Sequence, residues 1–181
     1  NGAVNFDRIV YRIVPEDAAR TTLLETGEAQ VIDRVTPQLA EPISTNPDVR
    51  LQEIVTSRIV YFILNQNRDL MKDARVRQAV NYAVDRESII ANILRGYGVL
   101  ADSPVSPAVE FYASQTPYVY DVEQARALLG EAGVAEGTEL VIWTPQGRYV
   151  GDRDFATAVQ SMMGEIGFNA SLQTFGDFPA Y

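Results

Sequence analysis

Four short segments rich in β-branched and aromatic residues are predicted to form strands. They cover residues 8–14, 30–35, 49–55 and 58–65. The last of them, RIVYFILN, is apolar almost throughout, which predicts a strand buried on both faces. Apolar residues at helical spacing predict a helix over residues 16–26. The first two strands and this helix therefore form a predicted strand–helix–strand unit with parallel strands.

An aspartate stands at the start of each of four further predicted helices. Asp73 precedes ARVRQAVNYAV, Asp85 precedes RESIIANILRG, Asp121 opens a third helix, and Asp154 is expected to cap a fourth. A carboxylate at this position accepts hydrogen bonds from the unpaired N–H groups of the first turn. Apolar residues three and four positions apart give each helix one face that is expected to pack inward.

The remaining segments complete an α/β pattern. Residues 37–47 hold at most a short helix, and residues 66–73 and 99–117 are predicted loops. Residues 139–143 and 168–175 are predicted strands on either side of the fourth helix. They form a second strand–helix–strand unit, so the fold class is α/β.

Composition excludes several classes of function. The 181 residues include no Cys and no His, which excludes disulfides, thiolate zinc sites and catalysis by imidazole. Carboxylates outnumber basic residues 24 to 15, and the net charge of −9 argues against nucleic acid as a partner, because neutralising phosphates requires a basic surface. No apolar run reaches the ~18 residues that span a bilayer.

No motif in the chain predicts a catalytic, metal or cofactor site. Gly96-Tyr-Gly98 follows a helix and is interpreted as a helix stop with a turn. Asp152 and Asp154 flank an arginine at a helix start, where capping and the helix dipole explain them better than a metal ion does. Glu139 and Asp85 are an imaginable glycosidase pair, but nothing in the sequence brings them together.

The loop over residues 144–151 is the best candidate for ligand binding. It lies between the carboxyl end of a predicted strand and the start of a helix, which is the edge where open α/β sheets bind ligands. Its candidate binding residues are Thr144, Gln146, Arg148 and Tyr149. Arg148 offers a bidentate partner for a carboxylate, and Tyr149 offers stacking or a hydrogen bond. An ordinary loop with a solvated Arg148 explains the same residues, and the sequence does not decide between the two. Trp143 is interpreted as a core residue.

Three stretches resemble a known family. The main one is YFILNQNRDLMKDARVRQAVNYAVDRESIIANILRGYG, supported by ARTTLLETGEAQVID and YVYDVEQARALLGEAG in the same order. Together they are similar to the extracellular solute-binding protein family 5, the peptide, dipeptide and nickel receptors of bacterial ABC importers. The resemblance implies structural roles for Arg75 and Arg77, with Asp73 and Asp85 as expected partners.

The resemblance also implies an architecture. It predicts a periplasmic binding protein-like fold of type II, with two lobes of which only part is present. Residues 1–58 would be the end of the first lobe, and residues 59–181 a hinge strand with the first half of the second, with Asn65 in the hinge. Asp177 and Pro179 predict the start of another helix, so the chain is interpreted as a piece of a longer one.

The function implied by the resemblance is binding without catalysis. The expected partners are a peptide or small-molecule ligand and the permease of an ABC importer, for a monomer in the periplasm or lipid-anchored at the cell surface. No cofactor is expected. Which solute is bound stays open among dipeptides, oligopeptides, glutathione, nickel chelates, sugars and opines. The alternative from another class is a carboxylate-based hydrolase on an α/β scaffold.

Overall fold

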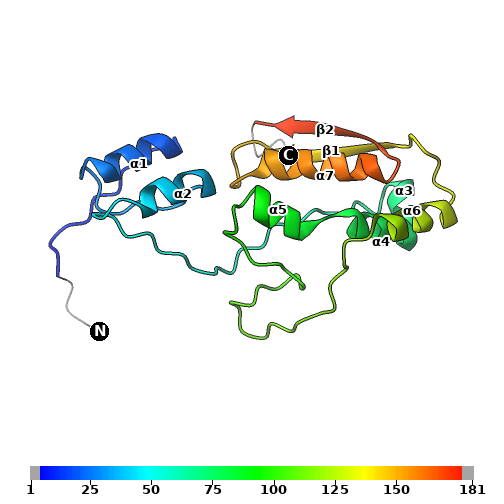
Figure 1. Ribbon diagram of the computed structural model, residues 1–181, viewed down its shortest axis with the longest axis horizontal. Helices are drawn as coiled ribbons and strands as arrows, with labels where there is room; N and C mark the ends of the chain where they lie inside the picture. The colour runs from blue at the N-terminus through cyan, green and yellow to red at the C-terminus, as the bar shows by residue number, and fades with distance from the viewer. Residues whose placement is uncertain (1–4, 177–181) are drawn as a thin grey trace. The chain divides into compact units, whose positions relative to one another are not determined.

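The computed structural model describes residues 5–176 in two compact units, which are residues 5–53 and 54–176. Figure 1 shows the order of the helices and strands along the chain. The expected helix start at Asp177 and Pro179 lies outside the described residues.

The first unit contains two helices, α1 (Asp17–Glu25) and α2 (Pro37–Ser44). Helix α1 was expected, and α2 lies in the segment 37–47 for which at most a short helix was predicted. Arg20 ties α1 to the chain before it, because its Nη1 atom donates to the carbonyl oxygens of Val14 and Pro15 at 2.9 and 2.8 Å. After α1 the chain turns at Gly27, whose φ of +78° is a conformation that glycine adopts without strain.

The four expected strands in the first 65 residues are wrong. The segments 8–14, 30–35, 49–55 and 58–65 are extended, but none is paired as a strand within the described chain. The segment 58–65 is also not buried, since 80% of Ile63 is exposed. The physical reason is that β-branched residues favour an extended backbone, whereas a strand exists only where a second strand accepts and donates its hydrogen bonds.

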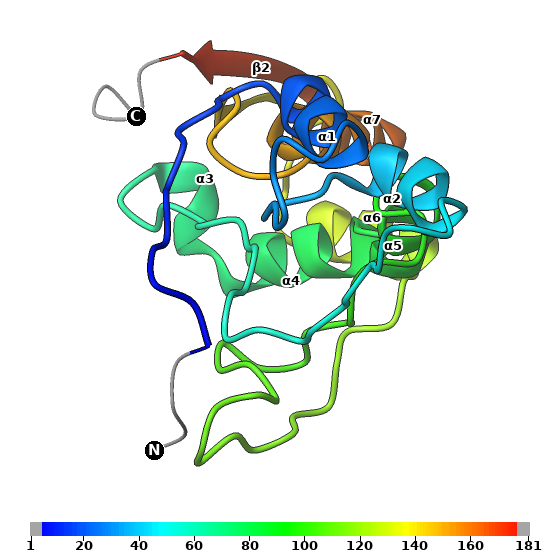
Figure 2. The ribbon, with the colours of Figure 1, turned by 90° about the vertical axis from the view of Figure 1, so that its left-hand side faces the viewer.

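The second unit begins with a helical layer. It consists of α3 (Asp69–Lys72), α4 (Ala74–Ala83), α5 (Arg86–Asn92) and α6 (Val122–Glu131). The short α3 lies inside the expected polar loop, so that part of the prediction is wrong. Residues 99–117 form the expected long loop without a helix or strand (Figure 2).

Three of the four predicted aspartate caps are confirmed. Asp73, Asp85 and Asp121 accept hydrogen bonds from main-chain N–H groups two or three residues later, at 2.8, 2.9 and 2.8 Å. Each therefore satisfies a donor that the first turn leaves unpaired.

A parallel two-stranded sheet completes the second unit. Strands β1 (Glu139–Pro145) and β2 (Asn169–Phe175) pair in register from Glu139 opposite Asn169 to Pro145 opposite Phe175. Helix α7 (Asp152–Glu165) connects them and packs against both (Figure 1). The predicted second strand–helix–strand unit is thus confirmed. Helix α7, however, begins at Asp152 after Gly151, and Asp154 is not its N-cap.

One hydrophobic core joins the helical layer to the sheet. Its buried side chains come from α3, α4, α6, β1, α7 and the turn between α7 and β2. The most enclosed large side chains in this unit are Val76 and Met163, each 1% exposed. Among the described residues, no helix is long and apolar enough to span a membrane.

Candidate ligand-binding site

The candidate site is the loop that leaves the carboxyl end of β1 and enters α7. Pairing continues one residue past the strand, because the Gln146 N–H donates to the Phe175 carbonyl oxygen at 3.0 Å. The loop then turns at Gly147 and Gly151, whose φ angles are +74° and +73°. Both residues adopt a left-handed conformation that a side chain would strain, so the two glycines define the shape of the loop.

The carboxylate of Asp152 forms hydrogen bonds with the main chain of this loop. It accepts hydrogen bonds from the main-chain N–H groups of Gly147, Arg148 and Tyr149 at 3.3, 2.8 and 3.1 Å. From the sequence alone, Asp152 is only one of two acids at a helix start. The available signal was its position a few residues after a glycine-containing turn, where an aspartate can accept main-chain bonds.

The four candidate binding residues do not occupy equivalent positions. Thr144 is buried, and its single hydroxyl proton lies within reach of the carbonyl oxygens of Pro145 and Asp152, with Oγ1 at 3.1 and 3.3 Å from them, so Thr144 forms the base of the loop. Gln146 and Arg148 are exposed, and Tyr149 is half-buried. The Arg148 guanidinium lies over the Tyr149 ring, 5.6 Å from its centroid. Contact of these residues with a ligand stays a prediction.

An aromatic pair lies at the same end of the sheet. The rings of Trp143 and Phe175 are 5.2 Å apart at an interplanar angle of 53°. Trp143 is 46% exposed, so its interpretation as a core residue is wrong. The reason is that alternate residues of β1 face opposite sides of the sheet, and Trp143 is on the side opposite the buried Ile142 and Thr144.

The predicted hinge residue Asn65 ends the extended segment with a turn. Its side-chain Oδ1 accepts from the Asn67 N–H at 3.0 Å, and its carbonyl oxygen accepts from the Arg68 N–H at 3.1 Å. This arrangement is an Asx turn, which redirects the chain toward α3. Whether Asn65 acts as a hinge between lobes stays a prediction.

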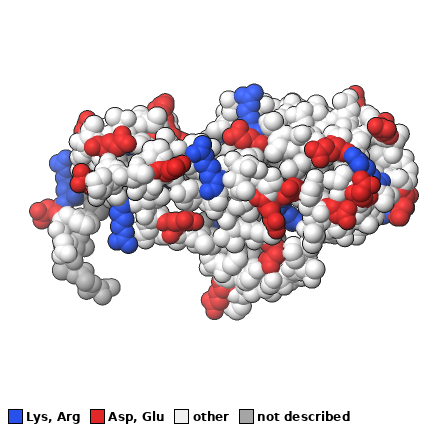
Figure 3. Space-filling model, in the orientation of Figure 1, with Lys and Arg blue, Asp and Glu red and all other residues white. Residues whose placement is uncertain are grey.

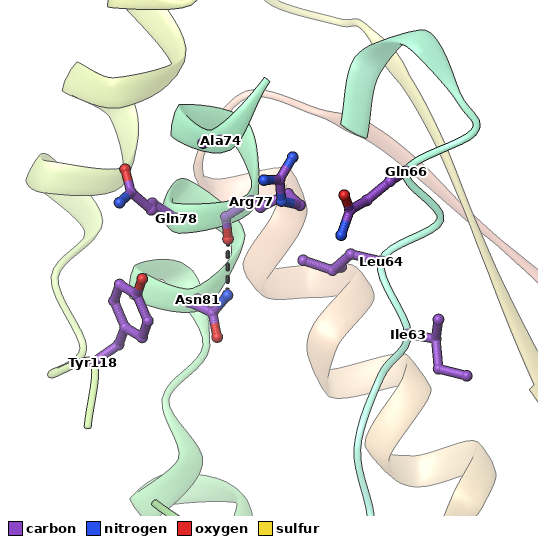
Figure 4. Close-up of a pocket in the computed structure, with 8 residues that line it drawn as sticks. All are labelled: Ile63, Leu64, Gln66, Ala74, Arg77, Gln78, Asn81 and Tyr118. Carbon is purple, nitrogen blue, oxygen red and sulfur yellow. Dashed lines mark hydrogen bonds between the residues drawn. The ribbon is translucent and has the colours of Figure 1, made fainter. Parts of the chain in front are cut away.

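A groove of about 480 Å³ lies between this extended segment and α4 (Figure 4). It is lined by Ile63, Leu64, Gln66, Ala74, Arg77, Gln78, Asn81 and Tyr118. Its polar groups are partly engaged with the protein, since Asn81 donates to the Arg77 carbonyl oxygen and Arg77 donates to those of Met71 and Lys72. The groove therefore offers amide groups and little free positive charge.

Two arginines of α4 have structural partners. Arg75 pairs with Asp73 as expected, with 2.6 Å between Nη2 and Oδ2. Arg77 was expected to pair with an aspartate, but its Nη1 donates to the last carbonyl oxygens of α3 at 2.7 and 2.8 Å. Carbonyl oxygens at a helix C-terminus carry partial negative charge, so a guanidinium is stabilised there without a carboxylate.

Two carboxylates have clearly altered acidity. The hydrogen bond from the Arg75 side chain lowers the pKa of Asp73 to about 2, and the bond from the Arg75 N–H adds to this effect. Hydrogen bonds from Ser114 and Tyr112 lower the pKa of Asp102. Since Asp102 joins two residues of the long loop, this carboxylate organises a segment that lacks helices and strands.

The acidic side chains of the described residues form no group of metal ligands. Within residues 5–176, no three His, Cys, Asp or Glu side chains are grouped so that they could hold a metal ion. Asp85 caps α5, while Glu139 begins β1. On the face of the molecule in Figure 3, the basic side chains are separated from one another by acidic and uncharged ones.

Comparisons with known proteins identify the family. The model of the bacterial extracellular solute-binding proteins, family 5 Middle, matches residues 1–181. Heme-binding protein A of Haemophilus influenzae is 34% identical over 145 residues, 78% of this chain and 26% of the relative. The dipeptide-binding protein of Escherichia coli is 30% identical over 173 residues, 93% of this chain and 32% of the relative.

A solved structure shows the same fold. The dipeptide-binding protein from Pseudoalteromonas sp. SM9913, in complex with Met-Leu, matches with a TM-score of 0.79 at 26% identity, covering 91% of this chain and 33% of that one. The fold is therefore that of part of a periplasmic binding protein, and the chain belongs to the bacterial extracellular solute-binding proteins of family 5. It spans about a quarter to a third of the length of the relatives it matches.

Proposed function

We propose that this chain is part of a substrate-binding receptor that delivers a peptide or a related small solute to the permease of a bacterial ABC importer. The observation that carries the proposal is the family match over all 181 residues. The dipeptide-binding relative and the Met-Leu complex support a peptide as the ligand class. The receptor acts in the periplasm or anchored at the cell surface, as a monomer and without a catalytic step.

The proposal assigns the chain to both lobes of such a receptor. Residues 1–58 belong to the first lobe and residues 59–181 to the hinge and second lobe, with Asn65 in the hinge. Closure of two lobes on the solute would then give the permease a distinct form of the receptor to recognise. The groups that contact the solute include Gln146, Arg148 and Tyr149. The buried Thr144 stabilises the loop that carries them.

The experiment that tests the function is a thermal-shift screen of the full-length receptor. Met-Leu, longer peptides, glutathione, heme, sugars and nickel chelates are added separately, since a ligand of the native state raises the melting temperature. A shift with Met-Leu or longer peptides supports the proposal. A shift with none of the peptides but with heme or a chelate contradicts the peptide assignment, and hydrolysis of a peptide by the repurified protein contradicts the absence of catalysis.

The role of Arg148 is tested by substitution. A hydrogen bond to a charged group contributes about 1.5 to 3 kcal/mol, so Arg148→Ala is expected to weaken binding of Met-Leu about tenfold or more. Arg153→Ala removes an exposed arginine from the first turn of α7 and is the matched control. Calorimetric titration measures both, and an unchanged dissociation constant for Arg148→Ala shows that the loop is only scaffold.

A further inference from the structure

Asp152 is bonded to the candidate binding loop through both of its carboxylate oxygens. Oδ2 accepts from the N–H groups of Arg148 and Tyr149 at 2.8 and 3.1 Å. Oδ1 accepts from the N–H groups of Gly147 and of the following residue, Arg153, at 3.3 and 2.8 Å. Four main-chain donors therefore converge on one ionised side chain, and bonds to an ionised acceptor are stronger than those between neutral groups.

The main chain of Asp152 is bonded to the same region. Its N–H donates to the Tyr149 carbonyl oxygen at 3.3 Å, and its own carbonyl oxygen accepts from the Thr144 hydroxyl, also at 3.3 Å. Because Thr144 is in β1 and Asp152 is the first residue of α7, this residue joins strand, loop and helix. The negative charge of Asp152 lies at the positive end of the α7 dipole, a position where a carboxylate stabilises the helix.

This arrangement determines where two side chains of the loop project. The N–H groups of Arg148 and Tyr149 share one oxygen atom, which fixes the main chain of these two neighbouring residues. Their side chains stack, with the guanidinium 5.6 Å from the ring centroid. Without the carboxylate, the N–H groups of residues 147–149 would lose their shared acceptor, and the turn is expected to be less ordered.

We propose that Asp152 is the positioning residue of the solute site: its carboxylate gathers the N–H groups of residues 147–149 and so presents Arg148 and Tyr149 as a preformed pair to an anionic group of the solute. This role rests on the proposed function, because Asp152 itself touches the loop and acts on the solute only through Arg148 and Tyr149. Preforming the pair lowers the conformational entropy that binding would otherwise cost.

The test compares Asp152→Asn with Asp154→Asn in the full-length receptor. Asparagine has nearly the same shape, but it replaces one of the two acceptor oxygens by an amide group that only donates, so two of the four bonds are lost. Asp154→Asn removes the same charge two residues further along α7 and serves as the control. The binding of Met-Leu is measured by calorimetry, and amide hydrogen exchange of residues 147–149 is measured without any ligand.

Asp152→Asn is expected to speed exchange at residues 147–149 at least about tenfold while the interior of α7 keeps its protection. It is also expected to weaken Met-Leu binding about tenfold. The double variant Arg148→Ala/Asp152→Asn should weaken binding by less than the two single losses combined, because residues that act through one another are not additive. If Asp152 contributed only to general stability, the losses of Met-Leu affinity in Arg148→Ala and Asp152→Asn would add in the double variant. The control Asp154→Asn should change neither the exchange rates nor the affinity.

Other outcomes separate this proposal from the proposed function. If Arg148→Ala weakens binding but Asp152→Asn does not, the positioning role is overturned and the function stands. If Arg148→Ala leaves binding unchanged, or Met-Leu does not bind, the assignment of the loop to a peptide site fails and the role of Asp152 in binding fails with it. Unchanged exchange at residues 147–149 in Asp152→Asn overturns the role of the carboxylate in shaping the loop, whatever the ligand.

Discussion

The guanidinium of Arg75 donates from Nη1 to the main-chain carbonyl oxygen of Glu131, 2.7 Å away and 56 residues further along the chain. Arg75 is in the first turn of α4, and Glu131 is the last residue of α6. The bond joins two helices that pack against each other and satisfies a carbonyl group that α6 leaves unpaired.

Two other helix ends also accept hydrogen bonds from an arginine of a neighbouring helix. Arg77 of α4 donates to the carbonyl oxygens at the end of α3, and Arg126 of α6 donates to the Glu165 carbonyl oxygen at the end of α7, at 3.1 and 2.7 Å. Each arginine meets the negative end of a helix dipole on another element. These arginines therefore orient the helices of the second unit, in agreement with a structural role in the family motif.

Replacing Arg75 should loosen the packing of α4 against α6. Arg75→Ala removes the bond to Glu131 and leaves Asp73 without its ion partner, and we expect the melting temperature to fall by about 3 °C. Arg75→Lys keeps the positive charge but lacks the planar guanidinium with its several N–H donors, so it should recover only part of the lost melting temperature. Thermal unfolding followed by circular dichroism measures both variants. Identical melting temperatures for Arg75→Ala and the wild type would show that the bond has no stabilising role.

The charge of Asp73 should make stability depend on pH in the acid range. Its pKa is lowered from 3.8 to about 2 in the folded protein, so the ionised form stabilises the fold above pH ~4, and this contribution is lost as the pH falls toward about 2. Asp73→Asn keeps a good N-cap but removes the charge. The stability difference between the wild type and Asp73→Asn should therefore be largest near neutral pH and disappear near pH ~2. Urea unfolding at several pH values measures it, and a difference that is constant with pH would contradict the assignment.

The core between α7 and the rest of the unit should be sensitive to truncation. Met163 is 1% exposed, so Met163→Ala removes a fully enclosed side chain and is expected to destabilise the protein by about 2 to 5 kcal/mol. Ser161→Ala changes an exposed position of the same helix and should alter stability by less than about 0.5 kcal/mol. Chemical denaturation compares the two, and a small effect of Met163→Ala would mean that the site collapses around the missing atoms.

The two units should differ in local stability. Within residues 5–53 the buried side chains are few, namely Thr21, Pro37, Ala40 and Ile43, whereas the second unit has a continuous core. Hydrogen exchange followed by mass spectrometry should therefore show faster exchange in α1 and α2 than in α4, α6 and α7. Equal protection of all five helices in the same protein sample would contradict this prediction.

Several features of this protein were predicted from local sequence because local chemistry decides them. Asp73, Asp85 and Asp121 cap the helices that follow them, and the apolar residues of α4 and α6 face inward as their spacing indicates. A cap involves groups two or three residues apart, and a helix forms all its main-chain hydrogen bonds within its own segment. The α7 unit with its parallel strands was predicted for the same reason, since its connection is short and continuous.

Other features depend on partners far away in the sequence. The extended segments 8–14 and 58–65 have strand-like composition, yet a strand needs a neighbour, and composition does not supply one. For the candidate site, the sequence predicted the loop with Arg148 and Tyr149, whose contact with a ligand stays a prediction, and it assigned the cap of α7 to Asp154. Both acids fit the start of a helix, and only the folded turn at Gly147 and Gly151 brings the loop N–H groups within reach of Asp152. The sequence by itself thus determined every helix but the short α3, three of the four predicted caps and the family. The tertiary structure decided which carboxylate shapes the loop and which arginines join the helices, because those bonds exist only between segments that folding brings together.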